Sequence, residues 1–327
     1  MDNEIEFSPD TALAKKREKR ALLRAVFAVT LPCVVFFIVT QYSSDIIIYI
    51  GEVFGYTRER MATAFADPVV VKLVQIALSF VLMTVPFILF SKIAGFNISR
   101  DAGLKKVDGK RLPYLVFGVG FCAFANIAVN EAGKIFERFG FEETATKSRE
   151  PEGLYGFLIV VISTAIVPGI LEEFAFRGIV TGILKPFGEG FSIIACASLF
   201  ALLHGNFEQI AFAFLVGLVL GFVRIRTGSL ILCMAIHAIN NFVAIMANSP
   251  GTFVPSQIKN IIYGAYIMLA LTLSIAGVAM LKGEDYKFRS GDGALSAKEI
   301  NVNFFLSLPV IAVFMLYLYR ALSVLFE

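Results

Sequence analysis

Residues 156–184 read GFLIVVISTAIVPGILEEFAFRGIVTGIL. This stretch is long enough to cross a bilayer as one helix, because a span needs about 20 mainly apolar residues. The whole chain has the same character: 57% of its 327 residues are hydrophobic and 17% are charged. A soluble domain is roughly 45–50% apolar and about 25% charged. The composition therefore excludes a soluble globular enzyme, a disordered chain and a nucleic-acid-binding protein.

The same length criterion identifies about nine candidate spans. They cover residues 21–50, 69–91, 113–130, 156–184, 190–204, 207–223, 228–247, 260–281 and 303–324. The fifth is short for a full crossing and could be a half-helix. The predicted fold is an all-helical transmembrane bundle of eight to nine spans with a polar cavity inside the membrane.

Basic residues are distributed unevenly between the two sides that these spans define. With the N-terminus inside, the inner segments hold most of the 29 Lys and Arg residues, beginning with a basic tail over residues 1–20. Because cytoplasmic loops carry an excess of basic residues, this pattern predicts a cytoplasmic N-terminus and an outer C-terminus. We expect a multi-pass integral membrane protein whose surroundings are the lipid bilayer, in the cell membrane if its source is prokaryotic.

The four cysteines each lie within an apolar run, and no two form a C-x-x-C pair. They are Cys33, Cys122, Cys196 and Cys233. This placement indicates small buried hydrophobic residues rather than a disulfide framework or a zinc knuckle.

Three ionisable residues interrupt the fourth apolar segment: Glu172, Glu173 and Arg177. Such groups cost about 2.5–3.5 kcal/mol each on insertion scales, so each is a candidate functional residue. Glu173 and Arg177 are four residues apart, with the acid first, which is the favourable order for an ion pair on one helix face. A purely structural salt bridge is a fair interpretation of that pair. Glu172 points about 100° away and is left free for proton transfer.

The only two histidines, His204 and His237, lie in the fifth and seventh segments. A rise of about 1.5 Å per residue from the inner ends places both at a depth similar to that of Glu172. Asn241 follows His237 by four residues and shares its helix face. A lone histidine in an apolar span more often makes a hydrogen bond between helices. Two histidines at one depth, beside the side-chain amide of Asn241, favour a functional site. Asn240 could instead supply the functional amide.

These segments together resemble the CPBP family of intramembrane proteases, the CAAX-processing and bacteriocin-processing enzymes related to the Ras-converting endopeptidase. That family is marked by EExxxR, then FxxxH, then HxxxN or HxxxB, each on its own membrane helix. Here the motifs read Glu172-Glu173-x-x-x-Arg177, Phe200-x-x-x-His204 and His237-x-x-x-Asn241. The resemblance covers residues 153–247, and the other spans are only generically compatible with the family.

The resemblance implies catalytic roles for Glu172, His204, His237 and Asn241. Glu172 would activate the attacking water, with His204 helping to hold and polarise it. His237 and Asn241 would stabilise the oxyanion of the tetrahedral intermediate as preorganised donors.

The resemblance also implies that Glu173 and Arg177 support the helix and position Glu172. Members of the family have been described both as metalloproteases and as metal-independent glutamate proteases. Glu172, His204 and His237 could supply three protein ligands to a catalytic zinc. The base would then have to come from elsewhere, since Glu173 is tied to Arg177. We therefore favour a water activated by Glu172 and His204 without an obligatory metal.

Two hypotheses about function follow. The first is an intramembrane endopeptidase that cleaves a peptide or a lipidated protein substrate. Its membrane helices would lie at 21–150 and 251–327, on either side of a catalytic core at 151–250. The alternative is a non-catalytic membrane protein, either an immunity or partner-binding factor or a transporter, that uses the polar cluster structurally.

Overall fold

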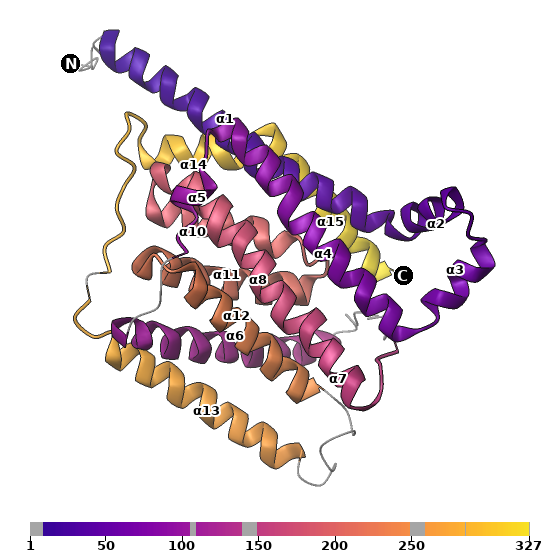
Figure 1. The fold of residues 1–327 in the computed structure, drawn as a ribbon. Coiled ribbons are helices and arrows are strands. Elements are labelled where there is room, and N and C mark those ends of the chain that lie inside the picture. The colour runs from indigo at the N-terminus through magenta and orange to yellow at the C-terminus, as the bar shows by residue number, and fades with distance from the viewer. Residues whose placement is uncertain (1–8, 105–108, 139–148, 249–258, 285, 327) are drawn as a thin grey trace.

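The computed structural model describes residues 9–104, 109–138, 149–248, 259–284 and 286–326, and these form a bundle of helices (Figure 1). In the described ranges, β pairing is limited to two isolated bridges, Leu104 with Ser229 and Gly188 with Ser290. The predicted all-helical fold is confirmed.

The helices follow one another along the chain with short connections. They are α1 (Pro9–Gln41), α2 (Ser43–Val53), α3 (Arg58–Phe65), α4 (Pro68–Ser91), α5 (Ile98–Asp101), α6 (Leu112–Arg138), α7 (Gly153–Val161), α8 (Val167–Glu173), α9 (Thr181–Leu184), α10 (Glu189–Leu202), α11 (Phe207–Thr227), α12 (Leu230–Asn248), α13 (Lys259–Met280), α14 (Ala297–Phe305) and α15 (Leu308–Phe326). Two π-helical segments, η3 (Ile162–Ile166) and η4 (Phe174–Val180), join α7, α8 and α9 into one continuous rod. Single 3₁₀ turns lie at η1 (Lys92–Ala94), η2 (Gly109–Arg111) and η5 (Lys185–Phe187).

Six helical stretches among the described residues are long and apolar enough to cross a membrane. They are Asp10–Gln41, Pro68–Ala94, Gly109–Ile135, Gly153–Phe187, Phe207–Thr227 and Tyr263–Met280. The bent pair α14–α15 raises the number to seven if it is one span, and α10 and α12 are shorter apolar helices. Helix length and composition thus support several spans, and the fifth predicted segment is indeed a short helix.

Two predicted spans are broken by the structure. The segment predicted at 21–50 ends as a helix at Gln41, and α2 starts at Ser43. The segment predicted at 303–324 bends by 53° between α14 and α15. Pro309 explains the second break, because its ring has no N–H to donate to the carbonyl of Phe305 and clashes with it. Pro309 instead lies in the first turn of α15, where a missing N–H costs nothing.

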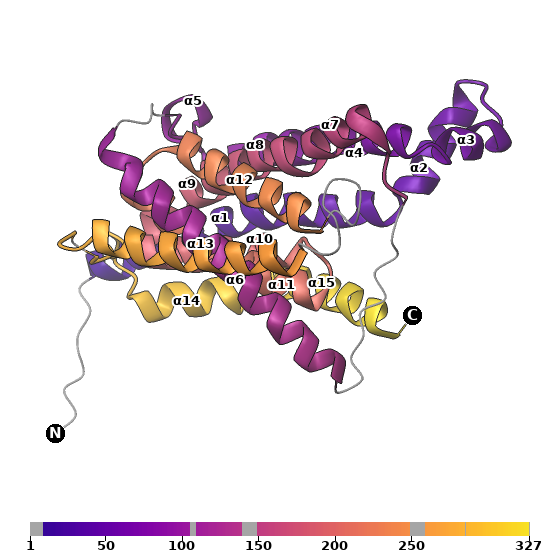
Figure 2. The same cartoon turned by 90° about the horizontal axis from the view of Figure 1, so that it is seen from below.

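Segments that the predicted topology places on one side of the membrane meet at one end of the bundle. Arg224 donates from Nη2 to the carbonyl of Ala102 at 3.0 Å. The carboxylate of Glu189 accepts the backbone N–H of Arg289 at 3.1 Å. Figure 2 shows α5 at this end, and α2, α3 and the C-terminus at the opposite end.

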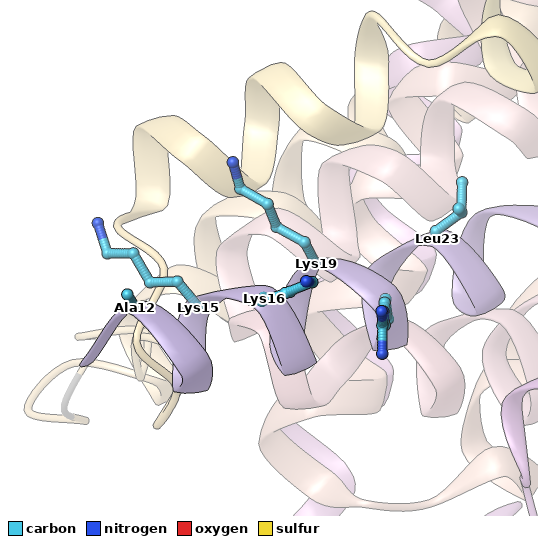
Figure 3. Close-up of a pocket in the computed structure, with 6 residues that line it drawn as sticks. Ala12, Lys15, Lys16, Lys19 and Leu23 are labelled. Carbon is cyan, nitrogen blue, oxygen red and sulfur yellow. The ribbon is translucent and has the colours of Figure 1, made fainter. Parts of the chain in front are cut away.

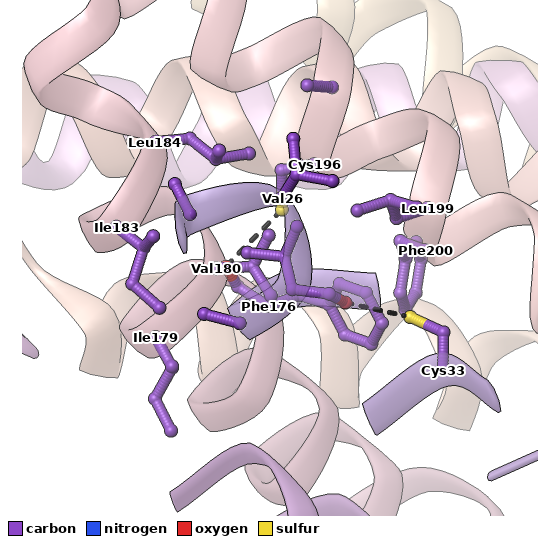
Figure 4. Close-up of a cluster of buried hydrophobic side chains, with 14 of the residues drawn as sticks. Val26, Cys33, Phe176, Ile179, Val180, Ile183, Leu184, Cys196, Leu199 and Phe200 are labelled. Atoms are coloured by element: carbon purple, nitrogen blue, oxygen red, sulfur yellow. Dashed lines mark hydrogen bonds between the residues drawn. The ribbon is translucent and has the colours of Figure 1, made fainter. Parts of the chain in front are cut away.

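The main core lies between α1, α10 and the rod that runs from α8 to α9. Val26, Phe176 and Leu199 are among its buried side chains (Figure 4). Cys196 donates from Sγ to the carbonyl of Phe176 at 3.3 Å. All four cysteines are buried and unpaired, which confirms the prediction of small core residues. This core fixes η4 and α10 against each other, and both carry candidate site residues.

Candidate active site

The helix that carries the two glutamates is distorted immediately before them. Pro168 has no N–H to donate to the carbonyl of Thr164, four residues earlier, and the helix is π-helical over η3. The carbonyl of Thr164 instead accepts Nδ2 of Asn241 at 3.1 Å. A Cβ built on Gly169 would lie 3.0 Å from Cβ of Ala238, so α8 and α12 are in very close contact there. The Pro168–Gly169 pair thus lets the helix of the EExxxR motif contact the helix of the HxxxN motif closely.

A buried ionic network lies at this crossing. Oε1 of Glu173 accepts from Nη1 of Arg177 at 2.8 Å and from Nδ1 of His237 at 2.7 Å. The side chains of Glu173 and Arg177 are both 0% exposed. The predicted ion pair is present, and Glu173 in addition bonds directly to the first residue of the third motif.

This network gives Glu173 a contact that the sequence did not predict. An ionised carboxylate only accepts hydrogen bonds, so Nδ1 of His237 carries the proton. Nε2 of His237 then points away from Glu173 and lies 3.9 Å from Oε2 of Glu172. Glu173 is therefore in direct contact with His237, and the support of Glu172 that the resemblance implies stays a prediction.

Glu172 occupies a more open place than its neighbour. Its side chain is 21% exposed. Its carboxylate is close enough to His204 for an electrostatic interaction between the two groups. The structure thus brings Glu172, His204 and His237 together from α8, the end of α10 and α12. The different environments of the two glutamates agree with the 100° separation expected from helix geometry.

The sequence predicted that His204 lies within the fifth helix. The structure instead places it just after the end of that helix. Helix α10 ends at Leu202, and His204 lies in the turn that leads through Gly205, at φ +73°, to α11. Nδ1 of His204 donates to the carbonyl of Phe200 at 3.1 Å. In the neutral ring this leaves Nε2 as an acceptor. A turn, rather than a helix face, therefore sets the orientation of this imidazole.

The two asparagines form a short chain of hydrogen bonds. Nδ2 of Asn240 donates to Oδ1 of Asn241 at 3.3 Å, and Asn241 in turn donates to Thr164. Asn240 is buried and Asn241 is partly exposed. Asn241 is therefore the more accessible of the two, and Asn240 donates to it.

Phe200, the first residue of the FxxxH motif, contacts three site residues at once. Cζ of Arg177 lies 4.3 Å from the centroid of its ring. The rings of His204 and His237 pack edge-on against it, with centroids 5.0 and 6.1 Å away. No role for this side chain was expected from the sequence. Its place four residues before a histidine, on the same helix face, was the available signal.

We expect Phe200→Leu to lower kcat by about tenfold with little change in KM, because the ring orients two imidazoles and covers the Arg177 guanidinium. Turnover measured well below the melting temperature checks this. Phe304→Leu is the matched control: Phe304 is equally buried and contacts Phe191 edge-on at 5.1 Å, far from the site. An equal loss of turnover in both variants would contradict a positioning role for Phe200.

The residues considered as zinc ligands do not form a ligand set here. No group of three or more His, Cys, Asp or Glu side chains able to hold a metal ion occurs in the part of the chain that the structure describes. Nδ1 of His237 is bonded to Glu173 and Nδ1 of His204 to a carbonyl. Both bonds leave Nε2 free, as in a metal-bound histidine, so the reason that no step below passes through a metal is that no set of three ligands lies close enough together in the described residues.

One family model matches the chain, over residues 154–243, and it is described as type II CAAX prenyl endopeptidase Rce1-like. The chain carries an Rce1-like domain. This confirms the resemblance inferred from the three motifs, all of which lie inside the matched residues. No curated protein and no solved structure matches the chain. The Rce1-like domain extends from α7 to α12 and supports a membrane protease as the class of function.

Proposed function

We propose that the protein is an intramembrane endopeptidase that hydrolyses a peptide bond of a membrane-anchored substrate. One observation carries the proposal: Glu172, His204 and His237 converge beside a buried ion pair, inside an Rce1-like domain. The description of the family favours prenylated CAAX proteins as the substrate class. A leader-bearing peptide and a membrane-anchored regulator are the other substrates that the sequence leaves open.

The first step is attack of water on the scissile carbonyl. The carboxylate of Glu172 takes a proton from a water molecule that Nε2 of His204 also binds. The resulting hydroxide adds to the carbonyl carbon, and the carbonyl oxygen becomes an oxyanion. A partly exposed carboxylate can reach such a water, whereas the fully buried Glu173 cannot.

The second requirement is stabilisation of that oxyanion. Nδ2 of Asn241 can donate to it through its second hydrogen. Nε2 of His237 can donate only when the ring is protonated on both nitrogens, since Nδ1 already donates to Glu173. The carboxylate of Glu172 lies 3.9 Å from this Nε2. Donors that are already fixed cost no reorganisation when charge develops.

The last step is collapse of the tetrahedral intermediate. The C–N bond breaks, and protonated Glu172 returns its proton to the leaving amine nitrogen. The products are a carboxylic acid and an amine, and Glu172 is again ionised. In this scheme Glu173 and Arg177 stay ionised throughout and hold His237 in place.

The predicted topology belongs to the same proposal. The N-terminus would lie in the cytoplasm, and a polar cavity inside the membrane would open the site to that side. The basic connections gathered at one end of the bundle support this orientation.

A proteolysis assay tests the proposed function most directly. Purified protein in proteoliposomes is incubated with a membrane-anchored CAAX peptide, with and without a strong chelator. We expect cleavage that resists the chelator and depends on Glu172. Cleavage that the chelator abolishes would support the metal-dependent alternative. Absence of cleavage of prenylated, otherwise lipidated and unmodified peptides alike would support a non-catalytic membrane protein.

The two asparagines make distinguishable predictions. Asn241→Ala should lower kcat by about 10²–10³-fold, the usual cost of one oxyanion donor. Asn240→Ala should cost clearly less, because it only orients its neighbour. Single-turnover rates on the same substrate measure both. The reverse order would assign the functional amide to Asn240.

A further inference from the structure

Helix α1 is longer than the membrane requires. It has 33 residues, or roughly 50 Å at 1.5 Å per residue, whereas the hydrocarbon core is about 30 Å thick. Leu22 and Val26 on one side of α1 are fully buried in the main core. Figure 1 shows that its first turns project beyond α14. The predicted topology places these turns at the level of the cytoplasmic lipid headgroups.

Three unpaired cations lie together on the projecting turns. Lys16, Lys19 and Arg20 are exposed, and within the described chain they form no ion pair. With Ala12, Lys15 and Leu23 they line a shallow hollow of about 570 Å³ (Figure 3). Lys15 is the exception, because its Nζ lies 3.0 Å from Oε1 of Glu299 on α14.

Exposed apolar side chains continue the same face towards the membrane. Leu23 is 49% exposed and Phe27 is 39% exposed. Leu23 follows Arg20, Lys19 and Lys16 by three, four and seven residues, and Phe27 follows Leu23 by four, which keeps both on one side of the helix. Cations at headgroup level above apolar side chains at acyl level match the two parts of a phospholipid.

We propose that this face of α1 binds an anionic phospholipid of the adjacent leaflet. The phosphate and headgroup contact Lys16, Lys19 and Arg20, and one acyl chain lies along Leu23 and Phe27. Free inorganic phosphate could contact the three cations, but it has no acyl chain to contact Leu23 and Phe27. The proposal does not depend on the proposed protease activity, since the face lies outside the Rce1-like domain.

The same helix contains a matched control. Arg17 and Arg24 are also exposed and form no ion pair within the described residues. At 100° per residue they lie roughly 100° around α1 from the centre of the Lys16, Lys19 and Arg20 cluster and about 40–60° from Arg20, at the edge of the exposed side of the helix. Replacing them removes two positive charges from neighbouring turns and leaves Lys16, Lys19 and Arg20 in place.

The experiment measures binding of a fluorescent phosphatidylglycerol to the full-length purified protein in detergent micelles. We expect Lys19→Gln/Arg20→Gln to weaken binding about tenfold or more. Arg17→Gln/Arg24→Gln should weaken it less than threefold. Fluorescent phosphatidylcholine should bind the wild type at least tenfold more weakly. Thermal unfolding of both variants should match the wild type, because all four side chains are exposed.

Three results would overturn the proposal. Equal losses in the two double variants would show diffuse attraction rather than a site on one face. Equal affinity for phosphatidylcholine would remove the role of anionic charge. Complete displacement of the lipid by excess inorganic phosphate would show that a free anion suffices. Weaker lipid binding in Leu23→Asn, with the charges intact, would support the acyl contact.

Discussion

Glu172→Gln is expected to abolish hydrolysis and to leave the protein folded. The amide has the size of the carboxylate but cannot take a proton from water, so we expect kcat to fall by at least about 10²–10⁴-fold. Glu172 is partly exposed and lies 3.9 Å from its nearest ionic partner, too far for a direct hydrogen bond. Its replacement should therefore change the melting temperature little. Turnover in proteoliposomes and thermal unfolding in detergent measure the two effects.

Glu152→Gln is the control for this variant. Glu152 precedes α7 and, within the described residues, its side chain makes only an exposed contact of 3.9 Å with Arg149. Such a pair contributes little to stability, so both turnover and melting temperature should stay at wild-type values. Normal cleavage by Glu172→Gln would refute the proposed mechanism.

Glu173→Gln is expected to destabilise the protein strongly and to reduce its activity. The substitution leaves the Arg177 guanidinium fully buried without its anion, and breaking a buried ion pair in this way costs about 3–5 kcal/mol. It also weakens the acceptor that fixes Nδ1 of His237. Thermal or denaturant unfolding in detergent measures the free energy of unfolding, and kcat at low temperature measures the loss of positioning.

A second substitution separates the two effects of Glu173. Glu173→Gln/Arg177→Met removes both charges, so it should recover part of the lost stability. It should not recover activity, because His237 still lacks the carboxylate. Wild-type stability together with no activity in Glu173→Gln would instead place Glu173 in direct contact with the substrate.

Local features of the site were predictable from the sequence because helix geometry is local. The i,i+4 spacing predicted the ion pair of Glu173 with Arg177, and the same geometry separated Glu172 from it. The break before Pro309 is also a local effect, because proline disturbs only the helical turn before it. The sequence prediction nevertheless treated 303–324 as one span, because the apolar composition continues through the proline. His204 was placed inside a helix for the same reason, since composition does not mark where α10 ends.

The sequence by itself determined an apolar helical chain, the three motifs and the division between the two glutamates. Only the tertiary structure decided that Glu173 holds His237, that Thr164 holds Asn241 and that Phe200 contacts both imidazoles. Glu173 and His237 are 64 residues apart, and Thr164 and Asn241 are 77 apart. Contacts of this kind depend on how closely helices approach, as at Gly169 and Ala238. The periodicity of one helix carries no information about which face of another helix it meets.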